Sequence, residues 1–376
     1  MPPGLLHVQI KGKPNSLDIA HLAGVSQATV SRALRGHASV NRATRERILE
    51  VAKQLNYKVD KNASNLRTQQ SGTLALLLFE DPTVDESNIN PFFLSMLGSI
   101  TRACAQRGYD LLISFQQLSR DWHADYEDCH KADGLILLGY GDYRDYRGRL
   151  EALVAQGTHF VRWGAVLADQ PGLSIGCDNH AGGLAAARHL LALGRRRIGF
   201  LGHASQGAPE FLERYQGYAA ALREAALTPD PLLQADAIST EQAGREAAEL
   251  VLERGARLDA LVCASDLIAI GAMRALRARG LRVPEDVAIV GYDDIPMAQF
   301  TNPALSSVQQ DTRRAGELLV DTLLKLVHGE PVQPLKLAPQ LIVRQSCGMP
   351  LQPTRSPATV TALPTRARRA ARGARH

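Results

Sequence analysis

The side chains best suited to chemistry lie in one short stretch, AGVSQATVSRAL at residues 23–34. Its hydroxyl, amide and guanidinium groups can bond to phosphate oxygens and base edges, and an alanine methyl can contact the methyl group of thymine. Arginine is the side chain most often used to read guanine in the major groove. The candidates for DNA contact are Ser26, Gln27, Ala28, Thr29, Ser31 and Arg32.

These side chains need a helix that turns them to one side. Winding residues 27–35 at about 100° per residue separates small and polar residues from the larger apolar ones. We expect Ser26 to cap this helix and Gly24 to allow the tight turn before it. The outward arc holds Gln27, Ala28, Ser31, Arg32 and Arg35, and the inward arc holds Val30, Ala33 and Leu34.

Two further short helices are expected around this one. The apolar residues of a helix over 17–23 are Leu17, Ala20 and Ala23, and those of a helix over 42–55, capped by Asn41, are Ile48, Val51, Ala52 and Leu55. Three short helices with a glycine turn between the first two predict an all-α helix-turn-helix domain over 1–57. The alternative is a helical hairpin that packs on another part of the chain.

The net charge of +5 is unevenly distributed along the 376 residues. Residues 1–72 contain 11 Lys and Arg against 4 Asp and Glu, a balance of +7. Residues 353–376 contain 6 arginines and no acidic residue, so the segment between these two carries −8. A basic head on an acidic body points to contact with a polyanion, and the alternative, which charge alone leaves open, is a solvated arm.

From residue 73 onward, apolar runs alternate with amphipathic helical stretches. This alternation predicts an α/β body of parallel sheets with helices on both faces. Such sheets bind ligands beyond the carboxyl ends of their strands. Strands are expected over 73–79, 110–115, 134–138, 159–163, 197–202, 259–263 and 287–292, and helices over 93–107, 180–193, 211–226, 240–254 and 267–279.

Enzyme motifs are incomplete in this body. GHASQGAP at 202–209 has the glycine spacing of a phosphate loop but lacks its Lys and Ser/Thr. CDNH at 177–180 offers one Cys and one His without a second ligand pair. The sequence has neither a GxSxG nor a GxGxxG motif. We expect no catalytic residue, metal or cofactor, and the alternative is a sugar-binding enzyme with a DNA-binding head.

Three segments together resemble the lactose-repressor/galactose-repressor (LacI/GalR) family of bacterial transcription regulators. They read LDIAHLAGVSQATVSRAL, VNRATRERILEVAKQLNY and NASNLRTQQSGTLALLL, and the resemblance covers about residues 16–346. It implies a sequence-specific DNA-binding regulator, expected to be a repressor. It also implies an effector-binding and dimerisation domain over 73–346, whose two lobes are similar to periplasmic sugar-binding proteins. One departure is Val59, where the family usually has proline.

The polar linker at 58–72 by itself predicts a mobile loop. The resemblance implies instead a hinge helix, over about 61–68, that becomes ordered on the operator. In that arrangement Leu66 would enter the minor groove between two base pairs, with Arg67 beside it.

The ends of the predicted strands provide candidates for effector contact. Aromatic rings there can stack on a sugar face or a planar base, a carboxylate can accept hydroxyl hydrogen bonds, and an arginine offers a fork of donors. The candidates are Phe92, Phe93, Trp163, Asp178, Arg214, Ser265 and Asp293. All except Asp178 and Ser265 match effector contacts of the family by position.

The predicted effector is a small sugar, such as a glucoside or a disaccharide. A nucleobase or nucleoside is the alternative. Arg162, unusual for the family, suggests an anionic or hydroxyl-rich edge on the ligand.

The tail and the cysteines bear on assembly and location. Residues 347–376 are basic and lack heptad leucines, so we expect a disordered tail and a homodimer formed by the body on a near-palindromic operator. Neither a membrane span nor an export signal is recognisable. The 5 cysteines, without CxxC spacing, favour reduced and mostly buried thiols. We expect a cytoplasmic protein, associated with the nucleoid when bound to its operator.

Overall fold

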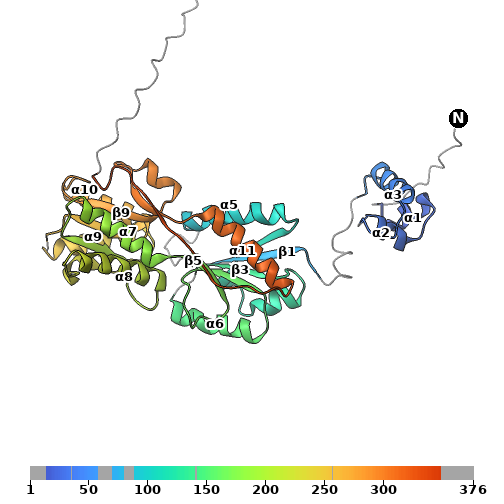
Figure 1. The fold of residues 1–376 in the computed structure, drawn as a ribbon, viewed down its shortest axis with the longest axis horizontal. Helices are drawn as coiled ribbons and strands as arrows, with labels where there is room; N and C mark the ends of the chain where they lie inside the picture. Colours follow the sequence, from blue (N-terminus) through green and yellow to red (C-terminus); the bar gives the residue numbers. More distant parts are fainter. Residues whose placement is uncertain are drawn as a thin grey trace, which may run out of the picture.

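The computed structural model describes residues 14–34, 36–57, 70–79, 89–139, 142–255 and 257–348. Most of the predicted hinge, with Leu66 and Arg67, lies outside these residues, and so do Val59, Arg35 and the tail from 349 onward. Element labels follow Figure 1.

Three helices form the N-terminal head: α1 (Ser16–Ala23), α2 (Gln27–Leu34) and α3 (Arg42–Gln54). The oxygen Oγ of Ser26 accepts a hydrogen bond from the Thr29 amide at 3.2 Å, and Oδ1 of Asn41 accepts one from the Thr44 amide at 2.8 Å. Gly24 ends α1 with a φ of 61°. The predicted helices, both caps and the glycine turn are thus confirmed.

The head has its own apolar core. Its buried residues are Ile19, Ala20, Ala23, Val30, Ala33, Val40, Ile48 and Ala52. The expectation for Leu17 was wrong, because its side chain is 60% exposed. The buried face of α1 is centred on Ile19 and Ala23, which lie one turn apart, and Leu17 lies off that face.

Two six-stranded sheets form the body, in the orders β11-β5-β4-β3-β1-β2 and β12-β10-β9-β8-β6-β7. The first contains β1 (Thr73–Leu78), β2 (Asp110–Phe115), β3 (Leu135–Leu138), β4 (Phe160–Trp163), β5 (Leu173–Cys177) and β11 (Leu335–Leu337). The second contains β6 (Ile198–Leu201), β7 (Gln234–Ala235), β8 (Ala260–Cys263), β9 (Ala288–Asp293), β10 (Ser306–Gln309) and β12 (Gln340–Ile342). All pairings are parallel except that of β10 with β12.

Helices cover both faces of each sheet. In the first sheet, Leu74, Leu76 and Leu78 share a core with α5 (Pro91–Gln106) and α11 (Thr312–Val327). The alternate residues Ala75 and Leu77 pack with α6 (Tyr143–Ala155) and the short helix η2 (His123–Asp128). The second sheet is covered by α7 (Asn179–Ala192), α8 (Pro209–Glu224), α9 (Glu241–Glu253) and α10 (Asp266–Ala278). The predicted parallel sheets with helices on both faces are confirmed.

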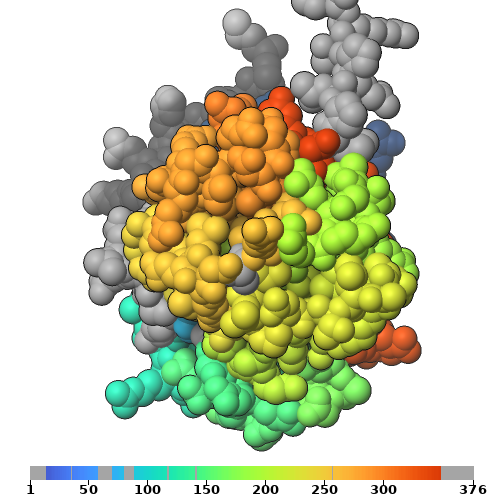
Figure 2. All heavy atoms as spheres, turned by 90° about the vertical axis from the view of Figure 1, so that its left-hand side faces the viewer, coloured from blue at the N-terminus to red at the C-terminus, as the bar shows by residue number. Residues whose placement is uncertain are grey.

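Each sheet with its helices is one lobe, and the chain passes between the lobes three times. Of the described residues, the N-lobe contains those within 70–177 and 311–337, and the C-lobe contains those within 178–310 and 338–348. The passages follow β5, β10 and β11, and Figure 1 shows the two lobes side by side. Figure 2 views the body from the C-lobe end, which the yellow and orange segments cover.

Some elements were not identified from the sequence: β5, β7, β10, β11, β12, α6 and α11. Of the five cysteines, Cys129 is exposed and the other four are buried as free thiols. None of the helices in the described part combines the length and apolar character needed to cross a bilayer.

Candidate functional site

The predicted DNA-contacting side chains lie together on the outer side of α2. Ser26, Gln27, Ala28 and Arg32 are exposed, while Thr29 and Ser31 are half-buried. Val30 and Ala33, on the opposite side, are buried in the head core. The predicted outward and inward arcs are confirmed for these residues, and their contact with DNA remains a prediction.

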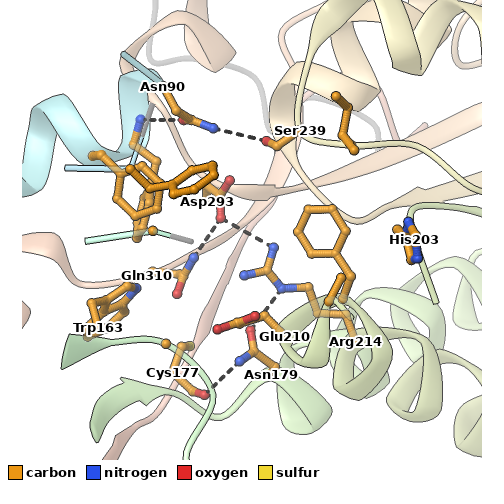
Figure 3. Close-up of a pocket in the computed structure, with 18 of the residues that line it drawn as sticks. Asn90, Trp163, Cys177, Asn179, His203, Glu210, Arg214, Ser239, Asp293 and Gln310 are labelled. Carbon is orange, nitrogen blue, oxygen red and sulfur yellow. Dashed lines mark hydrogen bonds and ion pairs between the residues drawn. The ribbon is translucent and has the colours of Figure 1, made fainter. Parts of the chain in front are cut away.

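A cavity of about 380 Å³ lies between the two lobes, within the size range of small-molecule sites. It is formed by residues that follow the carboxyl ends of strands or begin the next helices, as expected for parallel sheets. Its lining includes Phe79, Asn90, Phe92, Phe93, Asp142, Trp163, Asn179, His203, Glu210, Phe211, Arg214, Ile238, Ser239, Asp293 and Gln310. Five of the seven predicted effector contacts are therefore brought together here (Figure 3).

The polar centre of this pocket consists of Asn179, Arg214, Asp293 and Gln310. Arg214 Nε donates to Asn179 Oδ1 at 2.9 Å, and Arg214 Nη1 donates to the Ala264 carbonyl and lies 3.6 Å from Asp293 Oδ1. Gln310 Nε2 donates to the same Asp293 oxygen at 2.6 Å. Among the described residues, the polar contacts of this carboxylate all involve Oδ1. Oδ2 is therefore placed to accept hydroxyl hydrogen bonds from a ligand.

Burial raises the pKa of the Asp293 carboxyl group. Only 8% of the residue is exposed, and desolvation raises the pKa of its carboxyl group to about 6. The positive charge of Arg214 and the hydrogen bond from Gln310 oppose this increase. The pocket thus contains a carboxyl group that changes protonation near neutral pH.

Aromatic side chains of the N-lobe form the apolar wall of the pocket. The ring centroid of Phe92 lies 5.4 Å from that of Phe93 and 6.3 Å from that of Trp163. Asn90 caps α5 by accepting a hydrogen bond from the Phe92 amide at 3.0 Å, and this cap places both phenylalanines in the first turn of the helix. From the C-lobe, Phe211 lies under the guanidinium of Arg214 at 5.2 Å.

The position of Arg214 depends on close packing between α7 and α8. A Cβ added at Gly183 of α7 would lie 2.0 Å from the carbonyl oxygen of Arg214. Only glycine allows the two helices to approach this closely. The guanidinium also stacks over the ring of Tyr292, 3.7 Å from its centroid, so the side chain is held from two sides.

Polar contacts connect the lobes around the pocket. Asn90 Nδ2 of the N-lobe donates to Ser239 Oγ of the C-lobe at 3.1 Å (Figure 3). The Ala165 amide donates to Glu210 Oε1 at 2.7 Å, and Lys336 Nζ lies 3.2 Å from Glu213 Oε1. These three contacts tie the two lobes together.

Three expectations about effector contacts need correction. Asp178 and Ser265 do not line the cavity. Each caps the helix that follows its strand: Asp178 accepts from the Ala181 amide at 2.9 Å and Ser265 from the Ile268 amide at 3.3 Å. Arg162 is 1% exposed and donates to Ser174 Oγ and the Ala165 carbonyl, at 2.7 and 3.1 Å. It does not line the cavity and so gives no information about a ligand edge.

Several lining residues were missed from the sequence. Asn179 lies two residues after the end of β5, and Gln310 directly follows β10. Neither of these strands had been identified from the sequence. Asn90 and Ser239 lack a distinguishing signal, since a polar residue before a helix is common. Among the described residues no group of three or more His, Cys, Asp or Glu side chains is arranged to hold a metal ion.

Comparison with known proteins accords with this architecture. Residues 17–60 match the family model described as bacterial regulatory proteins, lacI family, and residues 187–347 match a periplasmic binding protein-like domain. HTH-type transcriptional regulator CelR of Thermobifida fusca is 32% identical over 89% of this chain and 98% of its own. HTH-type transcriptional repressor PurR of Haemophilus influenzae (strain PittEE) is 30% identical over 88% and 97%.

Two solved structures extend the likeness to three dimensions. A complex of the regulator CelR with cellobiose has a TM-score of 0.66 at 31% identity, and covers 89% of this chain and 99% of that one. The lac repressor dimer bound to operator and the anti-inducer ONPF has a TM-score of 0.75 at 25% identity, with the same coverage. The names of these relatives are those of transcriptional regulators rather than enzymes. The chain belongs to the lacI family of bacterial regulatory proteins: it is a DNA-binding transcriptional regulator with a periplasmic-binding-protein-like effector domain.

Proposed function

We propose that this regulator is a repressor whose affinity for its operator is changed by a small uncharged sugar, a glucoside or a disaccharide, bound between the lobes. The observation that carries the proposal is the aromatic wall of Phe92, Phe93 and Trp163 in the same cavity as the polar centre. A pyranose presents apolar C–H faces and a hydroxyl edge, and these two surfaces match the two kinds of lining.

Charge argues for a neutral ligand. The lining contains the acids Asp142, Glu210 and Asp293 but a single arginine or lysine, Arg214, among the described residues. Asp142 is already paired with Arg144 at 2.6 Å and Arg214 with Asp293, so among the described lining residues a phosphate or carboxylate on the sugar would meet no arginine or lysine without a partner. The cellobiose complex of CelR, which has a similar fold, is consistent with a neutral sugar.

On the DNA side, we propose that two copies bind a near-palindromic operator with Ser26, Gln27, Ala28, Thr29, Ser31 and Arg32 in the major groove. The exposed outer side of α2 supports this role. So does the lac repressor structure, which is a dimer bound to operator. Two recognition helices one helical turn apart would read the two halves of such a site.

A nucleobase or nucleoside is the second candidate effector, favoured by the relative PurR and by the aromatic rings. Titration calorimetry separates the two. Glucosides, disaccharides, hypoxanthine, guanine and their nucleosides are titrated into the protein, and each binder is then added to a complex with an operator selected from random DNA. The proposal expects heat from a sugar that also shifts operator affinity. Binding of a purine alone would assign the pocket to the second candidate.

A further inference from the structure

The place where the linker joins the body is held by one carboxylate. Asp133 Oδ1 accepts a hydrogen bond from the Ser71 amide at 2.5 Å, and Asp133 Oδ2 accepts one from the Gly72 amide at 2.8 Å. Two consecutive amides on the two oxygens of one carboxylate fix both the position and the direction of the chain. The linker precedes these residues directly, so this is where any movement of the body reaches the head.

Backbone contacts tie the same residues to both neighbouring strands. The Asp133 amide donates to the Thr73 carbonyl at 2.8 Å, and the Asp110 amide, at the start of β2, donates to the Gly72 carbonyl at 2.9 Å. Gly72 has a φ of +63°, a conformation that other residues adopt at a cost. The chain therefore enters the sheet through a sharp turn that is held by hydrogen bonds to both neighbouring strands.

The strands that leave this joint run to the ligand pocket. β1 follows Gly72 and ends next to Phe79, while β3 follows Asp133 and ends next to Gly139; Phe79 and Gly139 both line the cavity. The strands are paired from Ala75 and Leu135 to Leu78 and Leu138, and β3 is wholly buried. About 13 Å of buried, paired strand thus lies between the two places.

We propose that Asp133 is a positioning residue for operator recognition: its carboxylate fixes the exit of the linker relative to the N-lobe sheet, and so sets the separation of the two DNA-binding heads. Asp133 contacts neither DNA nor ligand in this role. It acts through the amides of Ser71 and Gly72, and converts a displacement of β1 and β3 into a displacement of the heads.

The test uses full-length Asp133→Asn and an operator selected from random DNA by the wild-type protein. The two backbone donors face different carboxylate oxygens, and in Asn one of these oxygens is replaced by an NH2 donor, so one backbone donor loses its acceptor in this geometry. We expect about tenfold weaker binding to the selected operator, binding to random duplex within twofold of wild type, and reduced discrimination against an operator with one base pair inserted at its centre. A general loss of folding would not change spacing discrimination in this selective way.

Asp145→Asn provides the matched control, because it removes the same charge from an exposed position on α6 of the same lobe. Removal of a negative charge by itself favours DNA binding, so charge alone predicts an effect of opposite sign to the one expected for Asp133→Asn. Asp133→Glu keeps both acceptors and the charge, and we expect an intermediate loss. Asp133→Glu is also the test variant if Asp133→Asn fails to fold.

The proposal is overturned if Asp133→Asn binds the operator with wild-type affinity and keeps its spacing discrimination. If only Asp133→Glu folds, the same result in that variant overturns it. An equal loss on operator and random duplex would do the same. The inference rests on the paired heads proposed above. If the heads do not pair on DNA, the selected sequences contain a single half-site. This outcome can therefore be distinguished from a failure of the proposal for Asp133.

Discussion

Arg214 Nη1 lies 3.6 Å from Asp293 Oδ1, although the two residues come from α8 and from the end of β9. Both side chains are almost fully buried, and a buried ion pair costs desolvation that its own attraction does not reliably repay. A ligand bound in the pocket would add hydrogen bonds to this pair and so offset part of the desolvation cost. The predictions below begin from this pair.

Asp293→Asn is expected to weaken the best-binding sugar by roughly 10- to 150-fold, since a hydrogen bond to a charged group contributes about 1.5–3 kcal/mol. Operator affinity without the sugar should stay near wild type. Calorimetry and a DNA-binding titration measure the two quantities. Asp178→Asn is the control: Asn caps a helix as well as Asp does, and Asp178 lies outside the cavity lining, so sugar affinity should not change. Equal losses in both variants would contradict the assignment.

The pKa of Asp293, raised to about 6 by burial, predicts that sugar affinity increases between pH 5 and pH 7. Below pH 6 the carboxyl group is protonated and accepts fewer hydroxyl hydrogen bonds, while above it both oxygens are acceptors. Calorimetry at intervals of half a pH unit measures the midpoint. In the Asp293→Asn protein, sugar affinity should not change over this pH range. A wild-type slope in that variant would mean that another titrating group causes the pH dependence.

Stability of the unliganded protein should show the opposite dependence. A carboxyl group whose folded-state pKa is raised favours the folded state while it is protonated, and this contribution is lost as the pH rises through about 6. Denaturant unfolding of wild type and Asp293→Asn at pH 4.5 and pH 7.5 isolates the contribution of this carboxyl group to the free energy of unfolding. The free energy of unfolding of wild type should fall relative to that of the variant between these two values. A constant difference would mean that burial does not perturb this group.

Arg32→Ala is expected to cost about 1–3 kcal/mol of operator binding and to relax the preference at one base of each half-site. Arg32→Lys keeps the charge but loses the planar fork, so it should retain affinity for random duplex while losing discrimination. Titrations at fixed salt against operator and single-base variants measure both. If specific and random duplexes lose affinity equally in Arg32→Ala, the residue contacts phosphate rather than a base.

Gly183→Ala should lower the free energy of unfolding by more than about 2 kcal/mol, because the added methyl would overlap the backbone of α8 at Arg214. The matched control is Gly148→Ala in α6, where no atom lies within 4 Å of the added carbon. There the change should stabilise the helix by up to about 1 kcal/mol. Urea unfolding compares the two, and similar small effects would mean that α7 and α8 can separate at little cost.

The head could be predicted closely because its signals are local. A helical period, caps at Ser26 and Asn41 and a glycine turn each depend on residues only a few positions apart. Leu17 shows the limit of this approach, since the choice of which face of a short helix is buried depends on the neighbouring helices.

The pocket was predictable where the preceding strands form continuous apolar runs. Phe92, Phe93, Trp163, Arg214 and Asp293 were found in this way, since the strand ends could be located. Asn179 and Gln310 follow LSIGC and SSVQ, strands whose serine and glycine residues interrupt the apolar run. These two segments become strands because neighbouring strands supply their hydrogen-bond partners. That pairing depends on the tertiary fold and is not visible in the local sequence.

Asp178 and Ser265 illustrate an ambiguity that sequence cannot resolve. The residue that follows a parallel strand can extend into the ligand cleft or turn back to cap the next helix. Both positions favour the same short polar side chains. In this chain, both residues cap helices.

The three passages of the chain between the lobes also limit how such a protein can be recombined. Neither lobe is encoded by one continuous stretch, because the N-lobe takes residues both before and after the C-lobe segment 178–310. The head, in contrast, is connected to the body once. A single genetic crossover in the linker can therefore give an existing body a new operator, whereas a new ligand specificity must arise by substitution within the body or by exchange of the whole body.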